Sequence, residues 1–270
     1  MARTKPKPSS KTRIAVCIPG KVMGSSFLAG WTDFLLHPRK KEFEISLHQF
    51  YSAIVHHARE VPAFEALKTN PDYLLWLDSD IEFDADDILN LIDSFKRLDD
   101  EHIGLLSGLY TTEGGYYNIG DFSKMDNGKG PYSFTYNELY VGNITDIIQP
   151  FIVDSVGMGF CLIKAKVFKE LEEPYFEPLK RPFNYRGPIC SLAPGMKDIM
   201  LLDECDSFCH RIREKGYDIL AEPNIIVGHQ KEMSMNTNYG DWINLETGSL
   251  VGSIPPTNIK EDYKKDKKFK

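Results

Sequence analysis

Hydrophobic positions in the N-terminal part of the chain fall into short continuous runs that alternate with amphipathic segments. Continuous runs of this length and bulk are typical of strands that are buried on both faces of a sheet. Between the runs, Phe27–Leu36 predicts one helix, and a second helix is expected from Asp84 or Asp86 to Arg97. The alternation predicts an α/β fold with a parallel sheet and helices on both of its faces. The strand candidates are Arg13–Pro19, Phe43–Phe50, Tyr73–Leu77 and Ile103–Tyr110.

The helical segment Ala53–Lys68 contains a proline. We expect an interruption near Val61 and Pro62, because proline cannot extend a helix from within. Arg59 lies at the centre of this segment, upstream of the strand Tyr73–Leu77. An exposed arginine on a helix is usually only a solvated side chain, whereas an arginine that enters a cleft could bind a diphosphate.

Two carboxylates follow a buried strand. Asp78 and Asp80 come directly after Tyr73–Leu77, with the small Ser79 between them. Ligands of an open α/β sheet bind at the carboxyl ends of the strands, and two acids there suit a divalent cation that also carries phosphate oxygens. The simpler alternative is a surface turn, because Asp-x-Asp is a common pattern. Three later acids are expected to be helix-start charges and not metal ligands: Asp84, Asp86 and Asp87.

The C-terminal half predicts a further helix, two short strands and a histidine. Leu202–Lys215 has the pattern of a helix, which Gly216 ends. Tyr217–Ala221 and Ile225–Val227 predict short strands, and His229 follows the second of them. A lone histidine in such a place is more often a turn or core residue than a ligand.

The chain is expected to form one folded domain between two polar ends. Residues 1–11 are basic and rich in proline and serine, which predicts a flexible leader. Residues 12–235 form the predicted domain, which changes character after residue 110. Residues 236–270 form a polar tail whose end is strongly basic and is compatible with weak contact to an acidic membrane surface.

Composition narrows the class of protein. The 270 residues are 42% hydrophobic and 26% charged, which is ordinary for a soluble globular protein. The formal net charge of −7 argues against nucleic acid as the main partner. No apolar run has the length of a membrane helix, and the five cysteines contain no Cys-x-x-Cys pair, so we expect reduced thiols in a cytoplasmic protein.

Four segments together resemble the GT-A glycosyltransferases, in particular the family-2-like inverting enzymes. No single segment is decisive, but all four occur in the order of that family and span most of the predicted domain. The resemblance implies a GT-A fold, which is a Rossmann-like mixed sheet flanked by helices with an acceptor-side region towards the C-terminus. It also implies that residues 12–110 are the nucleotide-binding half of the domain and residues 111–235 the acceptor half. The segments are Arg13–Gly20, Tyr73–Phe83, Val153–Phe168 and Asp203–His229.

The resemblance also implies roles for individual residues. Asp80 would bind a divalent metal, either Mn²⁺ or Mg²⁺, and His229 would complete the metal site. Asp78 would contact the metal or the ribose of a nucleotide-sugar donor, and the acceptor would be a carbohydrate or glycoconjugate. The remaining donor-site residues would be Pro19, Gly20, Arg59 and Ser79. Weaker candidates near the donor sugar or the acceptor are Asp154, Gly157–Gly159, Tyr239 and Trp242.

The chain departs from the family pattern where the catalytic base is expected. With Phe208 and Cys209 as anchors, Cys205 occupies the position of the usual aspartate, and a thiol is a poor substitute for that base. Glu204 is the first candidate for the base and Asp203 the second. A retaining mechanism and a non-catalytic carbohydrate-binding relative therefore remain as alternatives. A nucleotidyl- or phosphotransferase is a further alternative, since such enzymes also place paired acids at strand ends to bind metal and phosphates.

Overall fold

The structure is a computed structural model that describes residues 11–112, 116–122, 133–135, 149–182, 199–230, 233–236, 241–244 and 250–253. For residues 133–135, 181–182, 199–200, 233–236, 241–244 and 250–253, it describes the backbone alone. The chain forms two compact units, Met1–His229 and Gln230–Lys270. The first unit contains the sheet and helices that were predicted for residues 12–235.

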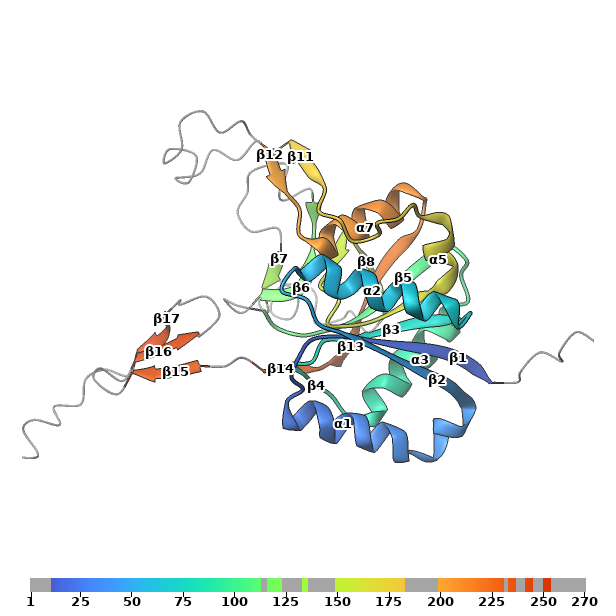
Figure 1. Ribbon diagram of the computed structural model, residues 1–270, viewed down its shortest axis with the longest axis horizontal. Helices are drawn as coiled ribbons and strands as arrows, with labels where there is room; N and C mark the ends of the chain where they lie inside the picture. Colours follow the sequence, from blue (N-terminus) through green and yellow to red (C-terminus); the bar gives the residue numbers. More distant parts are fainter. Residues whose placement is uncertain are drawn as a thin grey trace, which may run out of the picture. The chain divides into compact units, whose positions relative to one another are not determined.

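A seven-stranded mixed sheet forms the centre of the first unit (Figure 1). The strand β1 pairs in parallel with β2 and β3, and β5 pairs in parallel with β13. Strands β10 and β8 run antiparallel to their neighbours, which confirms the mixed sheet. The order across the sheet is β2 (Phe43–Phe50), β1 (Thr12–Pro19), β3 (Tyr73–Leu77), β10 (Phe160–Lys164), β5 (Ile103–Leu109), β13 (Asp218–Ile226) and β8 (Phe151–Val153).

Helices cover both faces of this sheet, as the alternating pattern predicted (Figure 1). One face carries α2 (Val55–Lys68), α5 (Ala165–Glu170) and α7 (Glu204–Glu214), and the other carries α1 (Ser25–Leu36) and α3 (Ala85–Leu98). A short 3₁₀ helix, η1 (Pro38–Glu42), connects α1 to β2. Asp84 caps α3 and forms a reciprocal capping box with Asp87, so these acids are helix-start charges, as expected.

Smaller sheets complete the two units. In the first unit, β6 (Tyr116–Gly120) pairs with β7 (Ser133–Thr135) and β9 (Ser155–Val156), and β11 (Lys180–Pro182) pairs with β12 (Ile199–Leu201). The two-residue strands β4 (Ile81–Glu82) and β14 (Gly228–His229) form a further pair. The second unit contains an antiparallel sheet of β15 (Met233–Asn236), β16 (Asp241–Asn244) and β17 (Leu250–Ser253).

Two interruptions predicted from the sequence, one in a helix and one between two strands, are wrong. The helix α2 continues through Pro62, although proline leaves the carbonyl of Ala58 without its helical donor. Pro62 and its neighbour Ala63 are buried, and their packing against the sheet outweighs the local preference. The two short strands predicted before His229 are one strand, β13, whose register shifts between Glu222 and Ile226.

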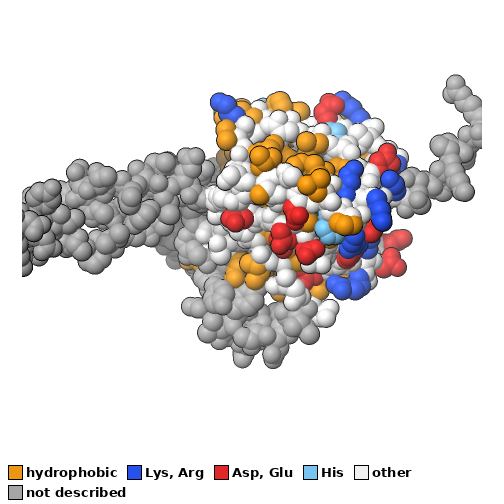
Figure 2. All heavy atoms as spheres, turned by 90° about the horizontal axis from the view of Figure 1, so that it is seen from below, with side chains coloured by type: hydrophobic (Ala, Val, Ile, Leu, Met, Phe, Trp, Pro, Cys, Tyr) orange, Lys and Arg blue, Asp and Glu red, His pale blue; other side chains and the backbone are white. Residues whose placement is uncertain are grey.

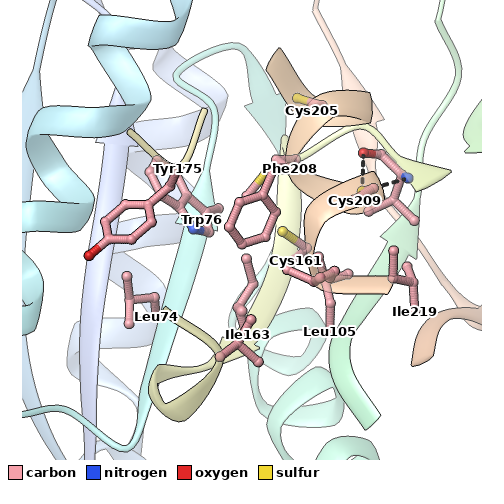
Figure 3. Packing of buried hydrophobic residues seen from close by; sticks show 14 of the residues in the cluster. Leu74, Trp76, Leu105, Cys161, Ile163, Tyr175, Cys205, Phe208, Cys209 and Ile219 are labelled. Carbon is pink, nitrogen blue, oxygen red and sulfur yellow. Dashed lines mark hydrogen bonds between the residues drawn. The ribbon is translucent and has the colours of Figure 1, made fainter. Parts of the chain in front are cut away.

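Aromatic side chains fill the core beneath α2 and α7. Phe176 stacks on Phe208 with ring centroids 4.7 Å apart, and Phe168 lies 5.1 Å from Phe208. Trp76 of β3 meets the edge of Phe176 at 5.4 Å. Figure 3 shows Trp76 and Phe208 in this cluster, with the buried thiols of Cys161, Cys205 and Cys209 nearby. Cys205 and Cys209 of α7 are therefore core residues.

The α1 side of the molecule presents exposed apolar residues. Leu28, Leu35 and Leu36 are exposed on α1. On the face in Figure 2, hydrophobic side chains gather beside intermixed acidic and basic ones, so the coloured part offers no extended field of one sign. Among the described helices, none combines the length and apolarity that a bilayer-spanning segment requires.

The aromatic cluster generates a prediction about stability. Phe208→Ala should lower the free energy of unfolding by about 3–5 kcal/mol, because it removes a fully buried ring from a packed core. Urea denaturation followed by circular dichroism measures the change. The control Phe64→Ala removes a ring that is 45% exposed and should lower the free energy of unfolding by only about 1 kcal/mol. Equal effects of the two substitutions would contradict the packing described.

Candidate functional site

The predicted donor residues meet where the chain changes direction across the sheet. The chain passes from β1 to β2 on one side and then returns through α2 to β3 on the other side of β1. In open α/β sheets, this kind of switch point opens a crevice at the carboxyl ends of the two strands. Pro19 and Gly20 end β1, and Asp78, Ser79 and Asp80 follow β3, so the structure brings these five residues together.

Gly20 makes the close approach of the two strand ends possible. Its φ is +146°, a backbone conformation that residues with a side chain rarely adopt. A Cβ at this position would lie 2.3 Å from Oγ and 2.8 Å from Cβ of Ser79. The Gly20 carbonyl accepts a hydrogen bond from Gln49, and its N–H donates to Phe50 at 3.1 Å. Ser79, which lies between Asp78 and Asp80, therefore packs directly against Gly20.

Asp80 and His229 lie side by side although most of the domain separates them in sequence. The pairing of β14 with β4 places His229 opposite Ile81, next to Asp80. The Nε2 atom of His229 is 3.1 Å from Oδ2 of Asp80. The His229 ring also packs edge-on against Tyr110, with centroids 5.1 Å apart. The pair predicted from the sequence is thus present in the structure.

The hydrogen bond at the other side of the His229 ring defines what Nε2 can do. Nδ1 lies 2.9 Å from the carbonyl oxygen of Thr111, and a carbonyl only accepts, so Nδ1 carries a proton. In the neutral ring, Nε2 then presents a lone pair that a cation between it and the Asp80 carboxylate can accept, whereas in the doubly protonated ring Nε2 donates directly to Asp80. A backbone partner of this kind commonly orients a metal-binding histidine.

The two donor atoms fit a divalent cation. Adjacent ligands of an octahedral ion with bonds of ~2.1 Å lie ~3.0 Å apart, close to the observed separation of 3.1 Å. One carboxylate oxygen and one imidazole nitrogen suit Mn²⁺ and are compatible with Mg²⁺. The chemistry and spacing of Asp80 and His229 are therefore compatible with a divalent cation, and equally with a direct ion pair between the two side chains.

Arg59 has two carboxylate partners. Its Nη1 and Nη2 atoms each lie 3.0 Å from an oxygen of Asp78, and its Nε lies 3.1 Å from Oε1 of Glu204. The Arg59 side chain is only 6% exposed and lies over the Trp76 ring at 5.7 Å. Burial lowers the pKa of Arg59, but the charges and hydrogen bonds of the two acids raise it well above its usual value. Arg59 is therefore a permanent buried cation.

Three groups with different chemistry begin α7. Asp203 is the N-cap, and its Oδ1 accepts a hydrogen bond from the Asp206 N–H at 2.7 Å. Glu204 is held by Arg59, and its Oε1 also accepts from the Cys205 thiol at 3.4 Å. Burial raises the pKa of Cys205 well above its ordinary value, so this thiol stays protonated. The three ligand atoms lie within 4.8 Å of one another, but capping and protonation already occupy two of them.

Asp203 has the most altered acidity of these acids. Desolvation by the surrounding chain and then the charge of Asp206 raise its pKa to about 7, with a smaller contribution from Glu204. The capping hydrogen bond and Arg59 act in the opposite direction. Asp203 nevertheless remains exposed to solvent at the start of the helix. A carboxylate with this pKa can accept a proton near neutral pH.

Tyr110 is a site residue that the sequence analysis did not identify. Its hydroxyl accepts a hydrogen bond from the Gly159 N–H at 3.0 Å, and the Gly159 carbonyl accepts from the Asp78 N–H at 2.8 Å. A Cβ on either Gly157 or Gly159 would lie within 3 Å of the Tyr110 hydroxyl. The predicted glycine turn thus packs on Tyr110, which in turn contacts His229. In the sequence, the two glycines Gly157 and Gly159 were the sign that another group packs closely against this turn.

The weaker candidates have other partners or lie outside the described residues. Asp154 forms an ion pair with Arg213 at 2.6 Å and accepts a hydrogen bond from the Phe122 N–H at 2.7 Å. These contacts fasten the loop after β6 to α7. Tyr239 and the side chain of Trp242 lie outside the described part of the chain.

Comparisons with known proteins give structural similarities only. No protein-family model matches the sequence, and no curated protein matches it. The chain is similar to the crystal structure of A197 from STIV, with a TM-score of 0.46 and 15% identity over 92% of this chain and 96% of that one. It is also similar to GalNAc-T7 with UDP, GalNAc and Mn²⁺, with a TM-score of 0.43 and 14% identity. That match covers 83% of this chain but only 44% of the other. At these scores, neither similarity carries an argument about function.

The contact between Gly20 and Ser79 generates a second prediction. Gly20→Ala should lower the free energy of unfolding by about 1–3 kcal/mol or more, because it adds a steric clash to a strained φ. Gly216→Ala is the matched control, since its φ is +84° but a Cβ there meets nothing within 4 Å. The control should lose only about 1 kcal/mol. Equal losses in urea denaturation would show that the Ser79 contact does not constrain the turn.

Proposed function

We propose that this protein is a metal-dependent glycosyltransferase of the GT-A type, which transfers a sugar from a nucleotide-diphosphate sugar to an acceptor hydroxyl. The observation that carries the proposal is the Asp80–His229 pair at the switch point of the sheet. The four ordered sequence segments support the same family. The cytoplasm remains the proposed location, on the basis of the cysteine pattern.

In this proposal, Asp80 and His229 hold the divalent cation. A bound cation would stabilise the negative charge that gathers on the diphosphate leaving group. Pro19, Gly20 and Ser79 would form the wall of the donor crevice, because they lie at the same strand ends. Asp78 would contribute from a fixed position, since Arg59 binds both of its carboxylate oxygens.

Asp203 is the better-supported base, although the sequence ranked Glu204 first. The base must accept the proton of the acceptor hydroxyl as the new glycosidic bond forms. Glu204 has Oε1 engaged by the Arg59 guanidinium and by the Cys205 thiol, so this oxygen already has two donors where the acceptor hydroxyl would have to bind. Asp203 is exposed, has a pKa of about 7 and is the N-cap of α7. With a carboxylate base acting on the acceptor hydroxyl, we propose inversion of configuration at the transferred sugar.

The metal pair generates a binding prediction. Asp80→Asn and His229→Ala should each weaken Mn²⁺ binding by about 100-fold or more, because each removes one of two protein ligands. Titration of Mn²⁺ by isothermal calorimetry, with and without a nucleoside diphosphate, measures the loss. His102→Ala, which removes an exposed histidine of a loop, is the matched control and should bind as the wild type does. Unchanged Mn²⁺ affinity in both site variants would contradict the proposal.

The products distinguish this reaction from its rival. Incubation with Mn²⁺ and a panel of nucleotide sugars should release nucleoside diphosphate if sugar is transferred or hydrolysed. Nucleotidyl transfer would instead release pyrophosphate or a nucleoside monophosphate. Sugar binding without any turnover across the panel would favour the non-catalytic relative that Cys205 at the base position suggests.

The acidity of Asp203 generates a prediction about pH. A general base must be deprotonated, so kcat/KM should rise as the pH increases through about 7, the pKa of Asp203. Asp203→Asn retains a good N-cap but removes the base, and kcat should fall by about 10²–10⁴-fold. A pH–rate profile of the wild type and the variant provides the check. An unchanged rising limb in Asp203→Asn would assign the base elsewhere.

A further inference from the structure

Arg59 joins two parts of the site that come from distant segments. Its guanidinium binds Asp78 at the end of β3 with two nitrogens and Glu204 at the start of α7 with the third. Strand β3 is paired with β1 and β10, whereas α7 packs on β9 and β13. The donor side and the acceptor side are thus connected through one buried side chain.

The geometry leaves the guanidinium little freedom. All three of its nitrogens have carboxylate partners at 3.0–3.1 Å, and the Trp76 ring lies against it. The residue after it, Glu60, accepts hydrogen bonds from the backbone N–H groups of Tyr175 and Phe176 at 3.0 and 2.9 Å. This part of α2 is therefore fixed against both the sheet and the segment that packs beside α7.

We infer that Arg59 is a positioning residue that sets the spacing between the metal-binding strand end and the proton-accepting helix start, an inference that rests on the proposed glycosyl transfer. Asp78 precedes the Asp80 ligand by two residues, and Glu204 directly follows Asp203. A cation that fixes Asp78 and Glu204 therefore orients both reacting ends. This role differs from the phosphate contact that the sequence resemblance implied for Arg59.

Only arginine meets the geometric requirement. Its rigid fork presents two parallel donors to one carboxylate and a third donor to another. Lysine supplies the same charge as a point on a flexible stem and cannot reproduce the bidentate contact. Arg59→Lys therefore keeps a buried cation but releases the spacing between Asp78 and Glu204.

Kinetics of Arg59→Lys separate positioning from phosphate binding. The variant should keep its Mn²⁺-dependent affinity for nucleoside diphosphate and its KM for the donor within about threefold. Its kcat should fall by about 100-fold, as expected when reacting groups are misplaced by about 1 Å. A loss of nucleotide affinity as large as the loss of kcat would overturn the inference and make Arg59 a phosphate ligand. Wild-type kcat in the variant would also overturn it.

A double-mutant cycle tests the connection even if the wild type transfers no sugar. Asp78→Asn and Glu204→Gln each leave Arg59 with one acid, whereas the double variant leaves it buried without a charged partner. The double variant should therefore lose more stability than the sum of the single losses, with a coupling of about fivefold or more in the unfolding equilibrium constant. Additive losses would overturn the connection.

A second cycle provides the control. Asp78→Asn combined with Asp93→Asn should be additive, because Asp93 binds a different arginine, Arg39, on another surface. Failure of the wild type to bind Mn²⁺ and nucleotide would reject the proposed function alone, since neither cycle measures ligand binding. Coupling in the first cycle and additivity in the second are the result that the inference requires.

Discussion

A buried guanidinium must be neutralised, and this requirement organises the acidic residues of the site. Arg59 is almost inaccessible to solvent, and the ion pairs with Asp78 and Glu204 compensate for its lost hydration. Those two acids are consequently held in place and are less available for other chemistry. The two remaining acids, Asp80 and Asp203, lie one or two residues away and face different partners. The position of the buried Arg59 thus decides which two of these four carboxylates are held in ion pairs with it and which two are not.

The short pairing of β4 with β14 positions His229. It is only two residues long in each strand, yet it brings His229 against Asp80. The Thr111 carbonyl and the Tyr110 ring then orient the imidazole from behind. Because Tyr110 also binds the turn that contacts the Asp78 backbone, both predicted acids of the strand end are supported from the same side.

The sequence predicted the strands and the acids because their signals are local. Continuous apolar runs predicted β1, β3 and β5, and the carboxyl ends of neighbouring strands meet regardless of sequence distance. It did not predict that α2 runs through Pro62, because tertiary packing decides that outcome. Nor did it predict that Arg59 would bind Asp78 and Glu204, since contacts between distant side chains leave no periodic pattern. His229 was identified through the family resemblance and not through its spacing.

The central claim is that Asp80 and His229 bind the catalytic cation. The most direct measurement is anomalous diffraction at the manganese edge from crystals grown with Mn²⁺ and a nucleoside diphosphate. We expect one strong peak within bonding distance of Oδ2 of Asp80 and Nε2 of His229, with the diphosphate beside it. A peak on the acids and thiol at the start of α7, with none at Asp80, would contradict it.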